Sequence, residues 1–228
     1  MEERFRQASR LAWRLRREGR PLQLPLEPPD GRFFREGEAL GLWEWRLGFP
    51  PGGRPLVAID VETTGLSPER DRITEIALVR MEAAGRRIYR RLVNPGRPIP
   101  PRVQQLTGIT DEDVRDAPPL EEILPEILPL VEDAVWVIQN ASFDLGFLTP
   151  ALRRAGLRMR PKVVDTLRLA RVTLPGLRSY RLGHLAEVLA WPGRRFHRAL
   201  DDAEATLWVA RELYYLRAEG RAIPLEAL

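Results

Sequence analysis

The sequence predicts an α/β fold: a mixed sheet of about five strands, flanked by helices and preceded by a small N-terminal extension. Two patterns support this prediction. Three β-rich segments come first, two of them joined as a hairpin, and two further apolar segments then alternate with helical stretches. The length agrees, since 228 residues can form one good-sized α/β domain plus an appendage.

The individual elements follow from the spacing of apolar residues. The predicted strands are 56–61, 73–81, 86–93, 134–138 and 163–164, with a turn at Ala84-Gly85 closing the hairpin. Residues 94–101 are predicted as a loop. The predicted helices are 120–131, 142–155, 166–172, 182–189 and 199–217. Ser142 is a candidate N-cap for the second of them.

The first 53 residues read as a separate extension, because Pro50-Pro51-Gly52-Gly53 forms a plausible boundary. The predicted domains are therefore 1–53 and 54–228. Residues 1–18 suggest a basic amphipathic helix, followed by a Pro-rich loop and a short segment with Trp43 and Trp45. The helix could contact phosphates, bind a partner or pack as a lid, and the packed lid is favoured.

Composition excludes several classes of protein. Apolar residues make up 44% and charged residues 30%, as in globular proteins, and no apolar run approaches the ~18 residues of a membrane span. We therefore expect no membrane partner. The chain has no cysteine, which excludes disulfides, zinc-thiolate sites and thiol catalysis, and which agrees with a reducing cytoplasm.

Charge is unevenly distributed along the chain. Residues 111–133 hold nine acidic residues and one arginine, whereas residues 168–198 hold seven arginines and one glutamate. Such asymmetry suggests that a polyanion binds on one side, although solvated helix faces can look similar. The functional interpretation is favoured for 168–198, because this stretch leads directly into His197.

Four carboxylates have the character of a metal site. Asp60 and Glu62 are two residues apart on a predicted strand, so they share a face, and their charges repel unless a cation lies between them. Asp144 opens the helix after the fourth strand, and Asp202 lies near the start of the last helix. Such oxygen ligands suit Mg²⁺ or Mn²⁺ and the two-metal cleavage of phosphodiesters.

His197 lies five residues before Asp202, on the loop that enters the last helix. Its near-neutral intrinsic pKa suits the removal of a proton from an attacking water. Taken alone, it would more often be a surface or capping histidine.

Other polar residues have structural interpretations beside functional ones. Thr110 with Asp113 resembles a helix cap, or could line a substrate groove. Asp165 is expected to be structural, as a helix cap. Tyr180 could stack on a base or pack against the protein.

Five motifs together resemble the DEDD superfamily of exonucleases, and the histidine five residues before the last aspartate marks its DEDDh branch. The motifs are 60–66 (DVETTGL), 106–110 (LTGIT), 140–144 (NASFD), 164–167 (VDTL) and 197–203 (HRALDDA). The resemblance runs from about Pro55 to Leu216. Within the branch, the chain most resembles the proofreading epsilon subunit of bacterial DNA polymerase III and its stand-alone relatives.

The resemblance implies a ribonuclease H-like fold and two Mg²⁺ or Mn²⁺ ions. Asp60 would bridge both ions, Glu62 and Asp202 would bind the first, and Asp144 would hold the second. His197 would be the general base.

The resemblance also implies residues that bind substrate. Thr63 would contact the 3′-terminal nucleotide, and Leu66 and Phe143 would pack against terminal bases. Gln139 departs from the family pattern, which usually has histidine there.

We therefore expect a metal-dependent 3′→5′ exonuclease that releases nucleoside 5′-monophosphates from single-stranded DNA ends, in proofreading or repair. RNA is an alternative substrate. A second alternative is a nucleic-acid-binding or polymerase-binding subunit with a vestigial nuclease site. The presence of all five catalytic residues argues against it.

Partner predictions concern the N-terminal extension. A DNA polymerase or sliding clamp could bind residues 1–50, where Gln23-Leu24-Pro25-Leu26 loosely resembles a clamp-binding motif. No long tail follows the last predicted helix, which leans towards a stand-alone nuclease unless residues 1–50 supply that contact.

Overall fold

The computed structural model describes residues 54–82, 85–191, 193 and 196–217. The amphipathic helix, the Pro-rich loop, the Trp-containing segment and the clamp-like motif predicted within residues 1–53 lie outside the described residues. The two-domain division at residue 53 therefore stays a prediction.

A five-stranded mixed sheet forms the centre of the described part of the chain. Its strands are β1 (Leu56–Thr63), β2 (Ile73–Glu82), β3 (Gly85–Leu92), β4 (Val135–Ile138) and β5 (Lys162–Asp165). They lie in the order β3-β2-β1-β4-β5, with β1, β2 and β3 antiparallel and β1, β4 and β5 parallel. The predicted mixed sheet is confirmed.

The helices cover the sheet. They are α3 (Pro101–Thr107), α4 (Asp111–Val114), α5 (Leu120–Val131), α6 (Ala141–Arg154), α7 (Thr166–Thr173), α8 (Leu182–Val188) and α9 (Ala199–Arg217). All five predicted helices are present within a residue or two of their predicted ends. Within the described ranges, no helix is both long enough and apolar enough to cross a membrane.

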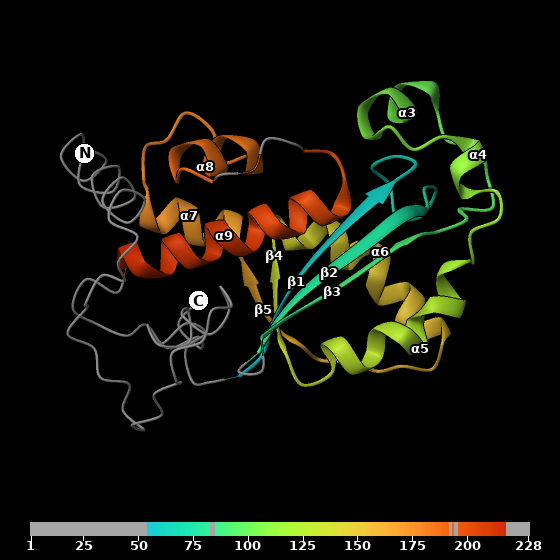
Figure 1. Ribbon diagram of the computed structural model, residues 1–228, viewed down its shortest axis with the longest axis horizontal. Helices are drawn as coiled ribbons and strands as arrows, with labels where there is room; N and C mark the ends of the chain where they lie inside the picture. The colour runs from blue at the N-terminus through green and yellow to red at the C-terminus, as the bar shows by residue number, and fades with distance from the viewer. Residues whose placement is uncertain (1–53, 83–84, 192, 194–195, 218–228) are drawn as a thin grey trace.

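Two apolar cores lie on opposite faces of the sheet. Figure 1 shows α9 crossing one face with α7 and α8 beside it, while α5 and α6 lie on the other face. Strand β1 serves both cores by alternation: Leu56 and Ala58 join the core under α9, and Val57 and Ile59 join the core under α5 and α6. The parity of a residue on β1 therefore decides which helices it faces.

Helix α5 persists despite two internal prolines. Pro125 and Pro129 each remove one helical hydrogen bond, but both lie on the exposed side, where water can bind the freed carbonyl groups. The opposite side buries five apolar residues against the sheet: Ile123, Leu124, Ile127, Leu130 and Val131. This burial outweighs the lost hydrogen bonds.

The start of α6 corrects one prediction. Ser142 is not the N-cap; it lies in the first turn, and the cap position is held by Asn140 in the left-handed conformation, at φ 59° and ψ 58°. The carboxylate of Asp165 accepts hydrogen bonds from the Asn140 and Ala141 amides, at 3.2 and 3.3 Å. It also caps α7 by accepting from the Leu167 amide at 3.0 Å, so its predicted capping role is confirmed.

Helices α3 and α4 fill a segment for which no elements were predicted. Helix α3 begins with Pro101 in its first position and is capped after Thr107 by Gly108, whose φ of +70° favours glycine. The predicted cap of Thr110 with Asp113 is confirmed: the Asp113 amide donates to Thr110 Oγ1 at 3.3 Å, and the Thr110 amide donates to Asp113 Oδ2 at 2.8 Å.

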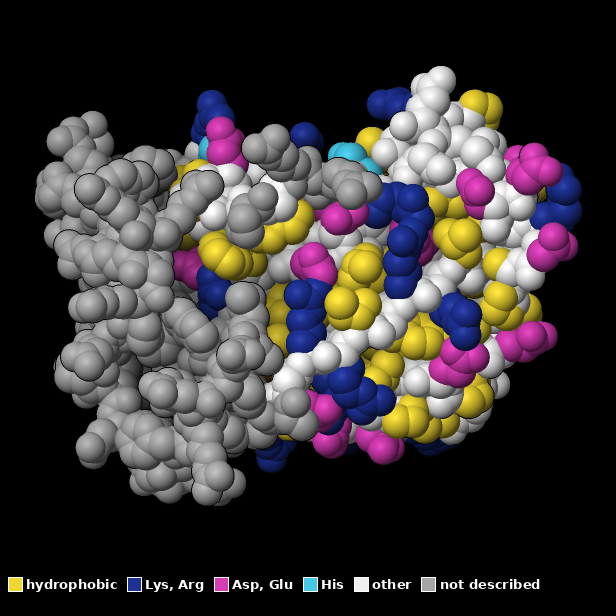
Figure 2. Space-filling model, in the orientation of Figure 1, with side chains coloured by type: hydrophobic (Ala, Val, Ile, Leu, Met, Phe, Trp, Pro, Cys, Tyr) yellow, Lys and Arg dark blue, Asp and Glu magenta, His cyan; other side chains and the backbone are white. Residues whose placement is uncertain are grey.

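The edge strand β3 carries arginines that are matched by acidic side chains. Arg86 pairs with Glu204 of α9, and Arg91 Nη2 lies 3.4 Å from Glu126 Oε2 of α5. Figure 2 shows basic and acidic side chains interspersed on the face that carries this strand. Charged side chains on an edge strand also discourage pairing with the edge of another sheet.

Candidate active site

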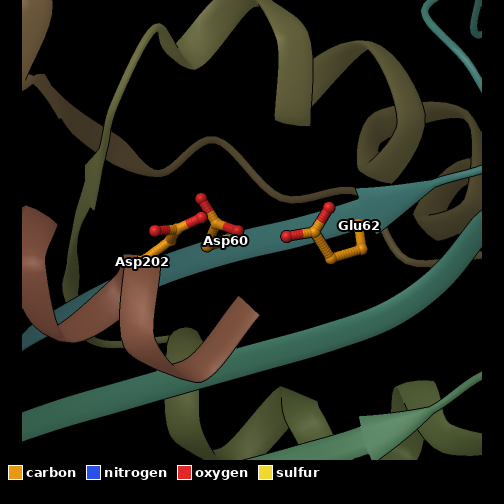
Figure 3. A group of neighbouring side chains, drawn as sticks. All are labelled: Asp60, Glu62 and Asp202. Carbon is orange, nitrogen blue, oxygen red and sulfur yellow. The ribbon is translucent and has the colours of Figure 1, made fainter. Parts of the chain in front are cut away.

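Three carboxylates meet between the sheet and α9. Asp60 and Glu62 continue the series of β1 residues that face α9, and Asp202 lies in the first turn of that helix. One oxygen from each residue lies within 4.8 Å of the oxygens from the other two, an arrangement that could hold a metal ion. Figure 3 shows the three side chains gathered between β1 and the start of α9.

Asp144 approaches from the other side of β1. It lies in the first turn of α6 and is only 3% exposed, and its Oδ1 accepts a hydrogen bond from the Val61 amide at 3.2 Å. The pairing of β1 with β4 ends at Ala58, so this amide is free to take a side-chain partner. Asp144 is not part of the group of three, but its charge is one cause of the raised pKa of Asp60.

Burial and nearby negative charge raise the pKa values of all four carboxyl groups. Burial is the largest cause in each case. The pKa of Asp60 lies well above its usual value, those of Glu62 and Asp144 rise to about 8, and that of Asp202 rises to about 7. For Asp60 and Glu62, the neighbouring carboxylates add repulsion to the effect of burial.

The donor set fits a hard divalent cation. Asp202 Oδ1 is buried and has no hydrogen-bond partner among the described residues, whereas Oδ2 accepts from the His197 amide at 3.0 Å. A buried carboxylate oxygen without a partner is costly. A cation would satisfy it and would also offset the repulsion among the three carboxylates, and oxygen ligands suit Mg²⁺ and Mn²⁺.

His197 stands at the entrance of α9, as predicted. Its side chain is exposed, and its backbone is left-handed with φ +65°, which is uncommon for a residue other than glycine. Its amide binds Asp202, so the backbone of His197 is fixed directly to the carboxylate group.

Glu75 of β2 was missed by the sequence analysis. It pairs across the sheet with Glu62, is 0% exposed, and binds Arg90, Arg198 and the amide of Ala199. The available signal was a single acidic residue within an apolar strand. Its partners lie up to 124 positions away in the chain, and no local pattern indicates their contact.

The three predicted substrate-binding residues lie in different environments. Thr63 is buried and donates to the Gly65 carbonyl at 2.6 Å. Leu66 is 84% exposed, and Phe143 is half-buried with its ring 5.2 Å from that of Phe147. Their contacts with substrate stay predictions.

The loop that presents Leu66 is tightly closed. The carboxylate of Asp71 accepts from the Ser67 amide at 2.9 Å and from Thr64 Oγ1 at 3.3 Å. A Cβ atom added to Gly65 would lie 2.4 Å from Asp71 Oδ2, so only glycine fits there without displacing that carboxylate.

Gln139, where the sequence departs from the family pattern, has a structural partner on each side. Its Nε2 donates to the Tyr180 carbonyl at 2.9 Å, and its Oε1 accepts from Thr166 Oγ1 at 2.5 Å. The Tyr180 hydroxyl donates to the Leu174 carbonyl at 2.9 Å, and its ring is partly buried against the core under α9. The packing interpretation of Tyr180 is therefore supported.

Comparison with known proteins identifies the family. Residues 57–210 match the family described as Exonuclease, so the chain belongs to the exonuclease family. The predictions of an exonuclease-family enzyme and of the ribonuclease H-like fold are confirmed.

Similar sequences occur within larger proteins. The chain is 40% identical over 153 residues to a PolC-type DNA polymerase III of Caldanaerobacter subterraneus subsp. tengcongensis, covering 66% of this chain and 11% of the relative. It is 39% identical over 153 residues to the 3′-5′ exonuclease DinG of Bacillus subtilis, covering 66% of this chain and 16% of the relative. The chain thus spans only a small part of these proteins.

Solved structures of exonucleases also resemble the chain. Exonuclease X in complex with 5′ overhanging duplex DNA is 30% identical, with a TM-score of 0.57, and the match covers 73% of this chain and 95% of that one. Escherichia coli exonuclease I in complex with a dA16 oligonucleotide has a TM-score of 0.60 at 21% identity, covering 71% of this chain and 41% of that one. The second likeness shows the fold alone.

Proposed function

We propose that the chain is a divalent-metal-dependent 3′→5′ exonuclease that hydrolyses the terminal phosphodiester of single-stranded DNA and releases nucleoside 5′-monophosphates. The observation that carries the proposal is the convergence of Asp60, Glu62 and Asp202 within 4.8 Å of one another, in a chain of the exonuclease family. Asp144 lies close enough for its charge to raise the pKa of Asp60.

The acidic side chains would hold the cofactor ions. Asp60, Glu62 and Asp202 would bind one Mg²⁺ or Mn²⁺, and Asp144 would bind a second together with Asp60. When bound, such ions neutralise the carboxylates and stabilise the negative charge that develops on the phosphodiester during hydrolysis.

His197 would act as the general base. Its exposed ring can reach solvent and substrate, and its backbone is tied to Asp202. In the proposed step the imidazole takes a proton from water as the water oxygen attacks the terminal phosphorus. The bond from phosphorus to the 3′ oxygen of the preceding nucleotide then breaks.

The surface beside the carboxylates would hold the strand end. The exposed Leu66 side chain, on a loop closed by Asp71, offers an apolar contact for a terminal base. Phe143 would pack against a base from α6, and Thr63 would contact the terminal nucleotide. DNA is favoured as substrate because exonuclease X, a relative at 30% identity, was solved with DNA.

We place this activity in proofreading or DNA repair in the cytoplasm. Relatives named as PolC-type DNA polymerase III and as the 3′-5′ exonuclease DinG support a role in DNA metabolism. A DNA polymerase or clamp partner stays a prediction, because the residues proposed to bind it lie outside the described ranges.

A comparison of substrates tests the proposal. End-labelled single-stranded DNA, duplex DNA and RNA of one sequence are incubated with the full chain and either Mg²⁺ or Mn²⁺. We expect single-stranded DNA to be shortened fastest, with mononucleotide products. Faster digestion of RNA would replace the DNA assignment with the exoribonuclease alternative, and binding without hydrolysis of any substrate would indicate a vestigial site.

A further inference from the structure

We infer that Glu75 is a positioning residue that fixes the His197 turn at the start of α9, so that the general base faces the strand end. This inference rests on the proposed function of His197. It adds to that function a second buried carboxylate whose role is to shape the turn.

Glu75 is placed to do this by the sheet. It lies on β2 directly opposite Glu62, and it belongs to the alternating series of β2 residues whose apolar members, Ala77, Val79 and Met81, pack in the core under α9. Its side chain therefore points to the layer that contains the start of α9, one strand away from the three carboxylates of the candidate metal site.

The oxygens of Glu75 are fully occupied by hydrogen-bond donors. Oε1 accepts from Arg90 Nε at 2.6 Å and from Arg198 Nη2 at 2.9 Å. Oε2 accepts from Arg198 Nε at 3.1 Å and from the Ala199 amide at 3.0 Å. Two arginines and an amide satisfy this buried charge, in contrast to Asp202, whose Oδ1 has no partner among the described residues.

This difference separates the two kinds of buried carboxylate. Asp202 keeps an oxygen available for a cation, whereas Glu75 has none to offer. Glu75 therefore acts on the site through the backbone that it holds and not as a metal ligand.

The held backbone contains His197. Glu75 binds Arg198 and Ala199, the two residues that follow His197, while the amide of His197 itself binds Asp202. The left-handed residue is thus held at its own amide by a carboxylate from α9 and through the residues after it by a carboxylate from β2. The His197 ring is exposed, so this backbone anchoring sets the point on the turn from which the ring extends.

Double substitution tests the inference through the rate. Glu75→Gln keeps the size of the side chain but places an amide donor against arginine donors. We expect it to slow digestion of single-stranded DNA at least about tenfold, since small misplacements of a catalytic group are costly. In the His197→Ala background the same change should cost less than about twofold, because groups that act as a unit are not additive.

Glu82→Gln is the matched control. Glu82 Oε2 also accepts a hydrogen bond from an arginine on β2, Arg80 Nε, at 2.9 Å. Glu82 lies at the opposite end of β2 from Glu75. We expect its rate to stay within about twofold of the unmodified chain, as is usual for substitutions away from a site. Equal losses from Glu75→Gln in both backgrounds, or no loss in either, would overturn the inference.

Hydrogen exchange gives a readout that does not depend on activity. Glu75→Gln should speed amide exchange across residues 197–203 and leave β1 and β4 protected. Arg198→Met, which removes a side chain that is 33% exposed, should act in the same direction and serves if Glu75→Gln does not fold. Unchanged exchange over 197–203 would refute the inference. If the unmodified chain does not digest DNA, the proposed function fails, while this exchange comparison still decides the role of Glu75.

Discussion

The residues that would carry the chemistry are also buried carboxylates that oppose folding when charged. Asp60, Glu62 and Asp202 are brought together away from bulk water, and the pKa of each is raised by burial first and by like charge second. Structural ion pairs elsewhere show the opposite pattern, since Arg80 lowers the pKa of Asp133. Clustered acids with raised pKa values favour a functional site over a structural ion-pair network.

His197→Ala is expected to slow digestion of single-stranded DNA by about 10²- to 10⁴-fold, the range typical of a lost general base. Metal binding, followed by calorimetry with Mn²⁺, should be retained because the four carboxylates are unchanged. His184→Ala is the control: it removes the other of the two histidines, which lies on α8 with Nδ1 3.4 Å from Glu187 Oε2. Equal rates for both variants would rule out the base assignment.

Asp202→Asn is expected to stabilise the metal-free protein while weakening metal binding. The amide keeps the shape of the side chain but removes one of three crowded charges, which should raise the free energy of unfolding by about 1–2 kcal/mol at pH 8. Denaturant unfolding with and without Mn²⁺ measures both effects. Asp201→Asn, one residue earlier on α9, is the control, and a metal-induced gain as large in Asp202→Asn as in the unmodified chain would contradict the ligand role.

At the level of elements, short motifs hold the site because each ends or begins a regular segment. The β1 strand runs into the Leu66 loop, α6 begins at the motif that contains Asp144, and α9 begins just after His197. Asp165 links the start of α6 to the start of α7 by accepting hydrogen bonds from both. The site therefore depends on how three element ends are fixed, more than on the interior of any helix.

Gly65→Ala tests the loop between β1 and β2. The new methyl group would meet the Asp71 carboxylate at 2.4 to 2.7 Å, so the loop must shift, at a cost of about 1–3 kcal/mol. We expect a lower melting temperature and slower digestion, because Leu66 is displaced. Gly183→Ala in α8, whose new methyl group would lie 3.9 Å from Phe196, is the control and should melt no lower than the unmodified chain. Normal melting and activity in Gly65→Ala would contradict this account of the loop.

Local sequence patterns predicted most of these elements, because alternation and helical periodicity reflect burial directly. Helix α3 was not predicted, since Pro98, Pro100 and Pro101 suggested a loop, although a proline in the first helical position suits a helix. The cap of α6 was assigned to Ser142 because a local hydroxyl is the usual cap, whereas the actual acceptor, Asp165, lies 24 and 25 residues away in sequence.

At the scale of the whole molecule, the sheet brings the distant motifs together. The parity of β1 places Asp60 and Glu62 towards α9, and the antiparallel partner β2 brings Glu75 to the same layer. The sequence could predict the four carboxylates and His197 as a set, because spacing and family resemblance mark them. It could not predict the Glu75 contacts or the left-handed turn at His197, which depend on packing between segments more than 120 residues apart.

The raised pKa values predict how the metal-free stability depends on pH. Unfolded carboxyl groups lose their protons near pH 4, whereas Glu62 and Asp144 keep theirs to about pH 8 and Asp202 to about pH 7. Their stabilising contribution is complete below pH 4 and is lost as pH rises through 7 and 8.

Without metal, the melting temperature should therefore fall between pH 6 and pH 8, and added Mg²⁺ or Mn²⁺ should restore it at pH 8. Thermal unfolding in chelator and in each ion measures this, with Glu62→Gln as a variant whose profile should be flatter. A metal-free melting temperature that rises over this interval would show that the buried carboxylates do not control stability there.

The most direct test of the central claim is the release of mononucleotides from a single-stranded DNA labelled at its 3′ end, with the unmodified chain and Asp60→Asn compared in Mg²⁺. We predict immediate release of labelled 5′-mononucleotide by the unmodified chain, none in chelator, and a loss of at least about a thousandfold in Asp60→Asn, because a charge that would bind both ions is removed. Full activity of Asp60→Asn, activity in chelator, or release that begins at the 5′ end would contradict the account.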